Sequence, residues 1–243
     1  MHPPIFNILI FFGLLSCRSH AASVLNNNSF DVFSITSGNY NSAYNSVTNP
    51  EGYVQSFADS GKFARLYLDT AMAIGWQTTA ADHKIEIWAS GFQGKISADG
   101  IQFAEINATT AATLYQDVQI TAAGGVDYSF YHRGRNGSDT VNLTITYLGV
   151  DNVFGGGDDI QQLSPDYTTG NTAWAQYAAN DAFTSVANGY YRFAFTAVDT
   201  SDHNTLEGNF LDNITFGVNA IPEPSVVLLS WCGMLALLRR RRA

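Results

Sequence analysis

The sequence of 243 residues predicts an all-β protein whose body is an antiparallel β-sandwich. Three observations lead to this prediction: apolar and polar residues alternate with period two in short segments, Gly/Asn/Asp clusters separate those segments, and no segment keeps a helical period. Each alternating segment can bury only one face, so two one-sided sheets are expected to cover each other. The body is long enough for one sizeable domain.

The alternating segments recur along the whole body. They are Lys84–Trp88, Ile101–Ile106, Leu114–Ile120, Val141–Tyr147 and Tyr191–Phe195, followed by a last strand over Phe210–Phe216. Residues that tolerate positive φ predict turns at Ala98–Gly100, Ala123–Gly125, Arg135–Gly137 and Asn188–Gly189. Upstream, residues 26–49 are rich in Asn, Ser and Tyr, and they predict a first strand over Ser29–Phe33 followed by a long loop.

The N-terminus has the pattern of a secretory signal peptide over residues 1–21. Ile5–Leu15 is an apolar run of the required length, and small residues follow at the positions that signal peptidase recognises. We therefore expect signal peptidase to cut between Ala21 and Ala22, although no Lys or Arg precedes the apolar run. The alternative is a lipoprotein acylated on Cys17, for which Leu15 is bulkier than usual.

Charge and cysteine content limit the functions of the body, residues 22–219. Residues 22–224 contain seven basic residues and all twenty-one acidic residues, a net charge near −14. The basic residues are scattered and form no stripe that could neutralise phosphates, so nucleic acid is not an expected partner. Both cysteines, Cys17 and Cys232, lie in terminal apolar segments, which excludes disulfides and thiolate metal sites from the body.

The C-terminus, residues 220–243, has three parts: a proline-flanked glutamate, an apolar stub and an arginine cluster. The stub, Val226–Leu238, is shorter than the about twenty apolar residues that an ordinary membrane-spanning helix needs. Arginines favour the cytoplasmic side of a membrane, so they orient the stub with the body outside. The charged and proline positions are Pro222, Glu223, Pro224, Arg239, Arg240, Arg241 and Arg242.

This tail resembles the PEP-CTERM sorting signal in all three parts. The resemblance implies that an exosortase in the membrane recognises residues 222–224, cuts near them and transfers the body to a surface acceptor. Membrane association is then transient, and exopolysaccharide is an expected partner because bacteria with this system typically make it. The alternative is a simple membrane anchor, in which the stub persists in the mature protein as a short hydrophobic helix.

The body resembles secreted bacterial jelly-roll domains of the galactose-binding-like type. The motifs that resemble them are Gly75-Trp76, Ile85–Trp88, Ala98–Gly100 leading to Phe103–Glu105, Leu114–Asp117 and Gly208–Asn213. The resemblance implies a jelly-roll sandwich. Its members include carbohydrate-binding modules and structural domains, so it indicates a fold more firmly than a ligand.

A sugar site is one candidate function of the body. Its cluster of positive donors is His132, Arg133 and Arg135, and a tryptophan, Trp76 or Trp88, could supply the aromatic platform. The alternative is structural: alternate residues of a strand point to opposite faces, so one arginine ends a strand in an ion pair with Glu105 or Asp117 and the other is solvated.

Calcium is the one cofactor that the sequence suggests, at two places. Asp151, Asp158 and Asp159 lie on a loop with three glycines, although their spacing is not that of an EF-hand. Turn capping by these aspartates is the alternative. Asp31 and Asp212 form the second candidate, by analogy alone, because jelly-roll modules often bind a structural ion where the terminal strands meet.

Catalysis is not expected. The body's histidines are far apart in the sequence and lack a metal or nucleophile context. Glu86 and Glu105 could form a glycosidase pair, but both occupy the polar phase of alternating strands, where a carboxylate is ordinarily solvated. The sequence therefore favours an exported surface or extracellular-matrix protein that contacts polysaccharide. A secreted carbohydrate-active hydrolase and a membrane-anchored envelope protein are the alternatives.

Overall fold

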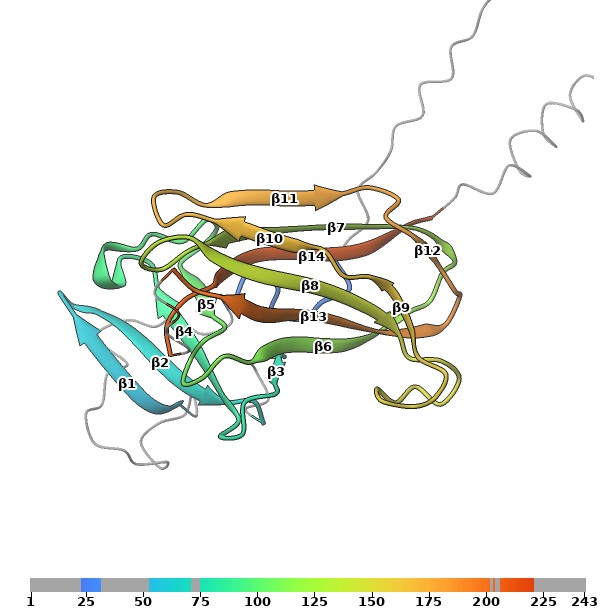
Figure 1. The fold of residues 1–243 in the computed structure, drawn as a ribbon, viewed down its shortest axis with the longest axis horizontal. Helices are drawn as coiled ribbons and strands as arrows, with labels where there is room; N and C mark the ends of the chain where they lie inside the picture. The colour runs from blue at the N-terminus through green and yellow to red at the C-terminus, as the bar shows by residue number, and fades with distance from the viewer. Residues whose placement is uncertain (1–22, 32–52, 71–74, 202, 204–205, 221–243) are drawn as a thin grey trace, which may run out of the picture.

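The computed structural model describes residues 23–31, 53–70, 75–201, 203 and 206–220. Within these residues the chain forms two antiparallel sheets that lie face to face (Figure 1). One is an eight-stranded sheet, in the order β1 (Tyr53–Asp59), β2 (Lys62–Leu68), β4 (Lys84–Ala89), β5 (Gln102–Glu105), β14 (Phe210–Ala220), β7 (Gly124–Arg133) and β11 (Ala175–Ala179), with β12 (Thr184–Ser185) also on β7.

The other is a six-stranded sheet. Its order is β10 (Asp166–Thr169), β8 (Asp139–Tyr147), β13 (Gly189–Asp199), β6 (Thr113–Ile120) and β3 (Gln77–Thr78), with β9 (Ile160–Leu163) also on β8. A turn of 3-10 helix, η2 (Phe92–Gly94), lies between β4 and β5. The expected all-β antiparallel jelly-roll sandwich is confirmed, since β5, β6, β7 and β8 alternate between the two sheets, as do β13 and β14.

The core between the sheets is formed by the apolar residues of the alternating segments that predicted the strands. Along β7, every second residue from Val126 to His132 is buried, and the residues between them are half-buried. Strands β8 and β13 contribute in the same way from the six-stranded sheet. Fully buried core side chains include Tyr67, Phe130, Leu143, Phe193, Phe195, Leu211 and Phe216. Burial of these large apolar groups supplies the main favourable free energy of folding.

A second apolar cluster covers the outer face of the eight-stranded sheet. Trp88 and Phe103 are cross-strand partners on β4 and β5, and Phe210 on β14 lies beside them. Phe92 of the 3-10 turn packs edge-on against Trp88, with 4.6 Å between ring centroids, and Trp174 contacts Phe103 in the same way. Because this cluster is covered, the sheet is buried on both faces in this region.

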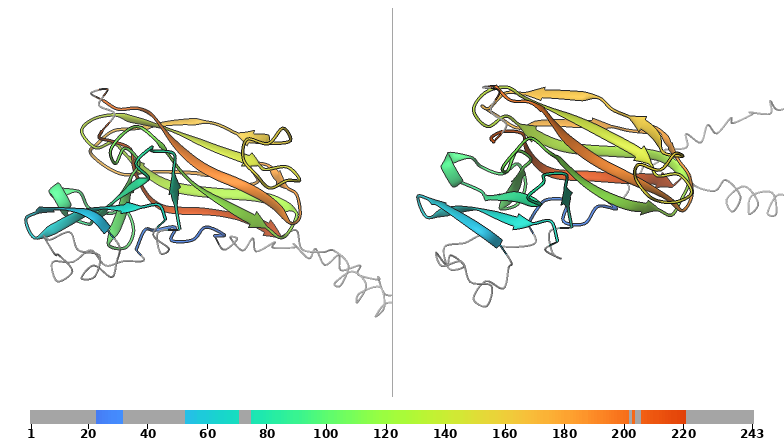
Figure 2. Two further views of the ribbon diagram at one scale, coloured as in Figure 1. Left: turned by 90° about the horizontal axis from the view of Figure 1, so that it is seen from below. Right: turned by 60° about the horizontal axis from the view of Figure 1, so that its bottom comes forward.

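The predicted first strand is wrong for the residues that the structure describes. Residues 29–31 of the expected strand Ser29–Phe33 form a turn, in which Phe30 adopts a φ of 61° and its ring is buried in the core. Residues 23–31 instead run beside β14, where the Val24 amide donates to the carbonyl of Phe216 and the Ile214 amide donates to that of Asn28 (Figure 2).

The predicted turn at Ala123–Gly125 is shorter than expected, since Gly124 already opens β7. No helix among the described residues is long and apolar enough to cross a membrane. The predicted signal peptide, its cleavage site at Ala21 and Ala22, the motif at residues 222–224, the apolar stub and the arginines at 239–242 lie outside the described residues.

Candidate functional site

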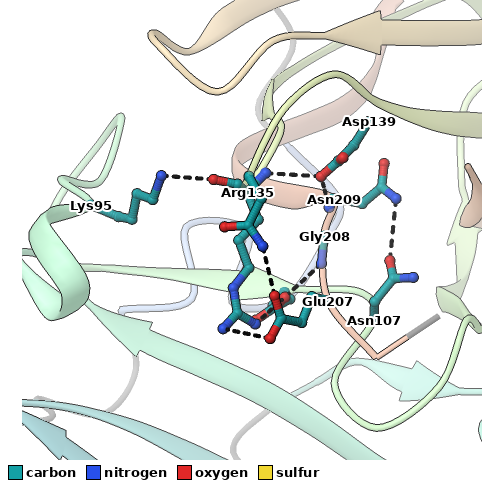
Figure 3. Close-up of polar contacts among 9 residues, drawn as sticks. Lys95, Asn107, Arg135, Asp139, Glu207, Gly208 and Asn209 are labelled. Carbon is teal, nitrogen blue, oxygen red and sulfur yellow. Dashed lines mark hydrogen bonds and ion pairs between the residues drawn. The ribbon is translucent and has the colours of Figure 1, made fainter. Parts of the chain in front are cut away.

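Arg135 forms an ion pair with Glu105, as the structural alternative to a sugar site predicted for one of the arginines. It lies just after β7, its Nη1 is 2.9 Å from Oε1 of Glu105, and its Nη2 is 3.4 Å from Oε1 of Glu207 (Figure 3). Its guanidinium carbon lies 4.9 Å from the ring centroid of Trp88. Arg135 thus joins the second apolar cluster to two carboxylates, and both of its terminal nitrogens are used in these ion pairs.

Backbone contacts hold the Arg135 cluster, defined as Glu86, Trp88, Glu105, Arg135 and Glu207. The Gly208 amide donates to Glu105 Oε1 over 2.7 Å, while Asp139 Oδ2 accepts the backbone amides of residues 135 and 209. Lys95 Nζ donates to the carbonyl of residue 135, as Figure 3 shows. These contacts bring β5, the β7–β8 loop and the start of β14 together.

The expectation that Glu86 and Glu105 are solvated carboxylates is wrong. Glu86 and Glu105 are cross-strand partners on β4 and β5, with 6% and 1% of their surfaces exposed. Burial, the charge of Glu105 and a hydrogen bond with it raise the pKa of Glu86 to about 9. Burial also raises the pKa of Glu105 to about 7, against the opposing effect of Arg135.

This geometry does not match a glycosidase pair. The two catalytic carboxyl groups of such enzymes lie about 5–9.5 Å apart, with room for a glycosidic bond or a water between them. Here both side chains are buried cross-strand neighbours, on the face of the sheet that also carries Trp88 and Phe103 of the second apolar cluster. Their burial leaves no open cleft for a glycosidic bond between them.

The other predicted donors also serve the fold. His132 points into the sandwich, is fully buried, and bonds Thr169 through Nδ1 and Asn209 through Nε2. Burial lowers the pKa of His132 to about 4, so this imidazole is neutral at neutral pH. Arg133, at the end of β7, donates through Nε and Nη2 to the carbonyl of Asn171. It anchors the loop before β11.

Neither tryptophan expected as a sugar platform presents its ring to solvent. Trp76 is 0% exposed, packs against Phe30 and donates to the carbonyl of Asn27 through its indole N–H. Trp88 is 1% exposed and is enclosed by Phe92, Phe103 and Phe210. Alternation could not identify this burial because Phe30, which packs on Trp76, and Phe210, which packs on Trp88, are distant in the sequence.

The first calcium candidate forms a loop whose aspartates cap backbone amides. Asp151 accepts from Val153, Asp158 accepts from Val150, and Asp159 accepts from Gly155. These carboxylates therefore cap turns, which was the alternative to calcium binding. Across the described part of the chain, no three His, Cys, Asp or Glu side chains are grouped so that they could hold a metal ion.

Asp31 and Asp212, the second calcium candidate, lie together as expected. Asp212 Oδ2 accepts the amides of Ala98 and Asp99, and Asp31 Oδ1 accepts that of Ile101, so both carboxylates hold the same loop. Burial raises the pKa of Asp212 to about 7, and the charge of Asp31 contributes to this shift. The partners of these two carboxylates are backbone amides, and calcium binding by Asp31 and Asp212 stays a prediction.

The fold also brings together residues that were not predicted as a site, on the outer face of the six-stranded sheet. Arg192 on β13 faces Asp117 on β6, and Nε and Nη2 of Arg192 each lie 2.7 Å from a different oxygen of that carboxylate. The guanidinium carbon of Arg192 lies 3.9 Å from the ring centroid of Tyr115 and 4.1 Å from that of Phe154. We call these four residues the Arg192 face.

The Arg192 face is open to solvent at its edges. Phe154 is 50% exposed, the Asp117 side chain is 33% exposed and that of Arg192 is 15% exposed. Both bonds to Asp117 use Nε and Nη2 of Arg192, so Nη1 takes no part in this ion pair. The face therefore offers an apolar ring beside a fixed, partly free guanidinium donor.

Polar side chains continue this surface along the sheet. Thr113 bonds Thr196, Thr140 bonds Thr168, and Asn142 bonds both Thr144 and Asp166. Hydroxyls and amides thus predominate over charges on these strands. The sequence does place Tyr115 and Asp117 two residues apart, on one face of β6, and likewise Tyr190 and Arg192 on β13. It contains no signal that β6 pairs with β13.

Comparisons with known proteins show no matching family model and no matching curated protein. Among solved structures, TmCBM61 in complex with β-1,4-galactotriose shares 11% identity over 82% of this chain and 99% of its own, with a TM-score of 0.44. The family 22 carbohydrate-binding module of Clostridium thermocellum Xyn10B shares 16% over 70% and 94%, with a TM-score of 0.41.

The enzymatically active domain of the bacteriophage CBA120 tailspike protein 4 is also similar. It shares 13% identity over 81% of this chain and 21% of its own, with a TM-score of 0.38. Similarity this distant does not identify a ligand.

Proposed function

We propose that this protein is an exported bacterial surface or extracellular-matrix protein whose non-catalytic sandwich contacts polysaccharide through the Arg192 face. In this proposal, signal peptidase and an exosortase process its two ends, and contact with the membrane is transient. The observation that carries the polysaccharide function is the open, aromatic and hydrogen-bonding surface formed by Tyr115, Asp117, Phe154 and Arg192. Structural calcium at Asp31 and Asp212 is part of the proposal.

The ends of the sandwich support processing at the predicted positions. Leu25 is buried in the core close to the N-terminal end of the described residues, and β14 ends at Ala220, two residues before Pro222. β14 is a central strand, paired with both β5 and β7. Cuts after Ala21 and near Pro224 would therefore leave every described strand intact.

Processing predicts a specific mature mass. The protein recovered from the surface of its host should begin near Ala22 and end near Pro224, with or without an attached group. Intact-mass measurement with terminal peptide mapping tests this result. Removal of residues 239–242 should leave an unprocessed or mislocalised product. Recovery of wild-type protein that still contains Val226–Leu238 would contradict sorting and favour the simple membrane anchor.

The chemistry of the Arg192 face supports a sugar ligand. An apolar ring packs well against the C–H face of a sugar, and a guanidinium held in place donates to hydroxyls with little loss of side-chain entropy. Asp117 fixes Arg192 and largely neutralises it. The net charge of the body, near −14, disfavours a polyanionic polymer, so a neutral polysaccharide is the expected class of ligand.

Removal of the free donor should weaken polysaccharide binding. We expect Arg192→Met to lower affinity about tenfold, about 1.4 kcal/mol, in affinity electrophoresis against galactomannan, xyloglucan and mixed-linkage β-glucan, with alginate as the anionic comparison. Lys84→Met, which removes a basic residue on β4, is the matched control and should bind as wild type does. Equal binding by the two variants would rule out the Arg192 face as the site.

A further inference from the structure

A polar hollow lies on the opposite side of the sandwich from the Arg192 face. It is on the outer face of the eight-stranded sheet, where β7 is flanked by β14 and β11. The surface is hollowed here because Ala178 on β11 carries only a methyl group and Gly217 on β14 carries no side chain. The hollow is lined by Asp127, Tyr128, Ser129, Gln176, Ala178, Asn180, Thr215 and Gly217.

The register of the strands gathers the polar groups of this hollow. Ser129 is the cross-strand partner of both Thr215 on β14 and Ala178 on β11. The two hydroxyls of Ser129 and Thr215 bond each other over 2.8 Å. One such bond uses one donor and one acceptor, so the pair keeps a free O–H and further lone pairs. These groups point to solvent.

Two amides complete the lining. Gln176 and Asn180 are both exposed, and within the described part of the chain neither side chain has a hydrogen-bond partner. A primary amide presents a donor and an acceptor side by side, which matches two neighbouring hydroxyls of a sugar. The hollow therefore offers fixed hydroxyls at its floor and unused amides at its rim.

The carboxylate of Asp127 is held in place by two hydrogen bonds. Its Oδ1 accepts the backbone amide of Asp181, and its Oδ2 accepts from the side chain of Asn219. Each oxygen keeps a lone pair for a ligand hydroxyl. No basic residue lines the hollow, so nothing there would attract an anion. These groups suit a neutral, hydroxyl-rich ligand.

We propose that this hollow is a second binding site, for a neutral sugar unit of a polysaccharide. The inference rests on the proposed function, since the first site is the Arg192 face. The two sites lie on the outer faces of opposite sheets, with the sandwich core between them. One straight polymer cannot lie on both, so a protein with both sites links two polysaccharide chains.

Cross-linking and binding are separable by experiment. Full-length protein is mixed with galactomannan, xyloglucan or mixed-linkage β-glucan, and affinity electrophoresis measures binding while viscosity and light scattering measure cross-linking. We expect the double variant Gln176→Ala/Asn180→Ala to keep binding within about twofold and to lose most of the protein-dependent rise in viscosity. Ala178→Phe, which fills the hollow from an exposed position, should have the same effect without removing a polar group.

Gln55→Ala, an exposed glutamine of β1, is the matched control and should cross-link as wild type does. Wild-type viscosity in both hollow variants would overturn the second site while leaving the proposed function intact. Failure of the wild-type protein to bind any of the three polymers would overturn the proposed function and this inference with it. Loss of binding in the hollow variants, with Arg192→Met unaffected, would support the hollow and reject the Arg192 face.

Discussion

Replacement of Arg135 by methionine should lower the free energy of unfolding by about 3 kcal/mol, the low end of the cost of breaking a buried ion pair. In a domain of this size that loss corresponds to a fall of about 6–12 °C in melting temperature. Methionine keeps the apolar stem against Trp88 and removes the charge that lies 2.9 Å from the carboxylate of Glu105. Thermal and urea denaturation measure the change.

The large effect has a specific origin in the burial of Glu105. Its side chain is 0% exposed, so water cannot replace the guanidinium. Without Arg135, the carboxyl either stays charged at a high cost or takes up a proton. The loss should therefore be larger at pH 8 than at pH 5.5.

A double-mutant cycle separates this pair from general damage to the fold. Arg135→Met combined with Glu105→Gln removes both charges, and the combined loss should be smaller than the sum by at least about 1 kcal/mol. Arg192→Met is the control for a more exposed pair, for which about 1 kcal/mol or less is expected. Additive losses in the cycle would contradict a coupled pair.

Local alternation was enough to predict the core strands but not what covers them. β4, β6, β8 and β13 lie where the period-two segments predicted them, because one face of each strand packs in the sandwich core. Glu86 follows the same alternation, yet it is buried. Its face of the sheet is covered by the 3-10 turn at Phe92 and by Trp174, which are separate segments of the chain.

For the candidate sites too, neighbours in the sequence could be recognised, whereas contacts between distant segments could not. His132, Arg133 and Arg135 are neighbours in the sequence, but their side chains separate. His132 enters the core, Arg133 contacts the loop before β11, and Arg135 pairs with Glu105 on β5. Arg192 and Asp117 are 75 residues apart, and only the pairing of β13 with β6 brings them together. A single sequence contains no signal for that pairing.

The buried acids also predict an unusual pH dependence of stability. The pKa of Glu86 is raised to about 9 and that of Glu105 to about 7, whereas both ordinarily have a pKa of 4.5. The folded protein thus keeps protons that the unfolded chain has already released above pH 4.5. A group of this kind stabilises the fold at low pH, and its contribution is lost as pH rises through the folded pKa.

His132 acts in the opposite direction over a lower range. Its pKa is lowered from 6.5 to about 4, so the unfolded chain binds a proton there that the folded protein does not. This contribution to stability is present above pH 6.5 and is lost as pH falls toward 4. Above pH 6.5 the glutamates act without this opposition, and the growing negative charge of the body adds to their effect.

We therefore expect the melting temperature to fall as pH rises from 6.5 to 9, with Glu86 alone contributing on the order of 2 kcal/mol between pH 7 and pH 9. Differential scanning calorimetry across this range measures the fall.

Glu86→Gln keeps the shape of the side chain and removes its titration, so this variant should flatten the fall and be more stable than wild type at pH 9. Glu207→Gln, at the half-buried edge of the same cluster, should keep the wild-type slope. A Glu86→Gln variant with an unchanged slope would mean that the proton is held elsewhere, and Glu105→Gln would then be the variant that flattens the fall.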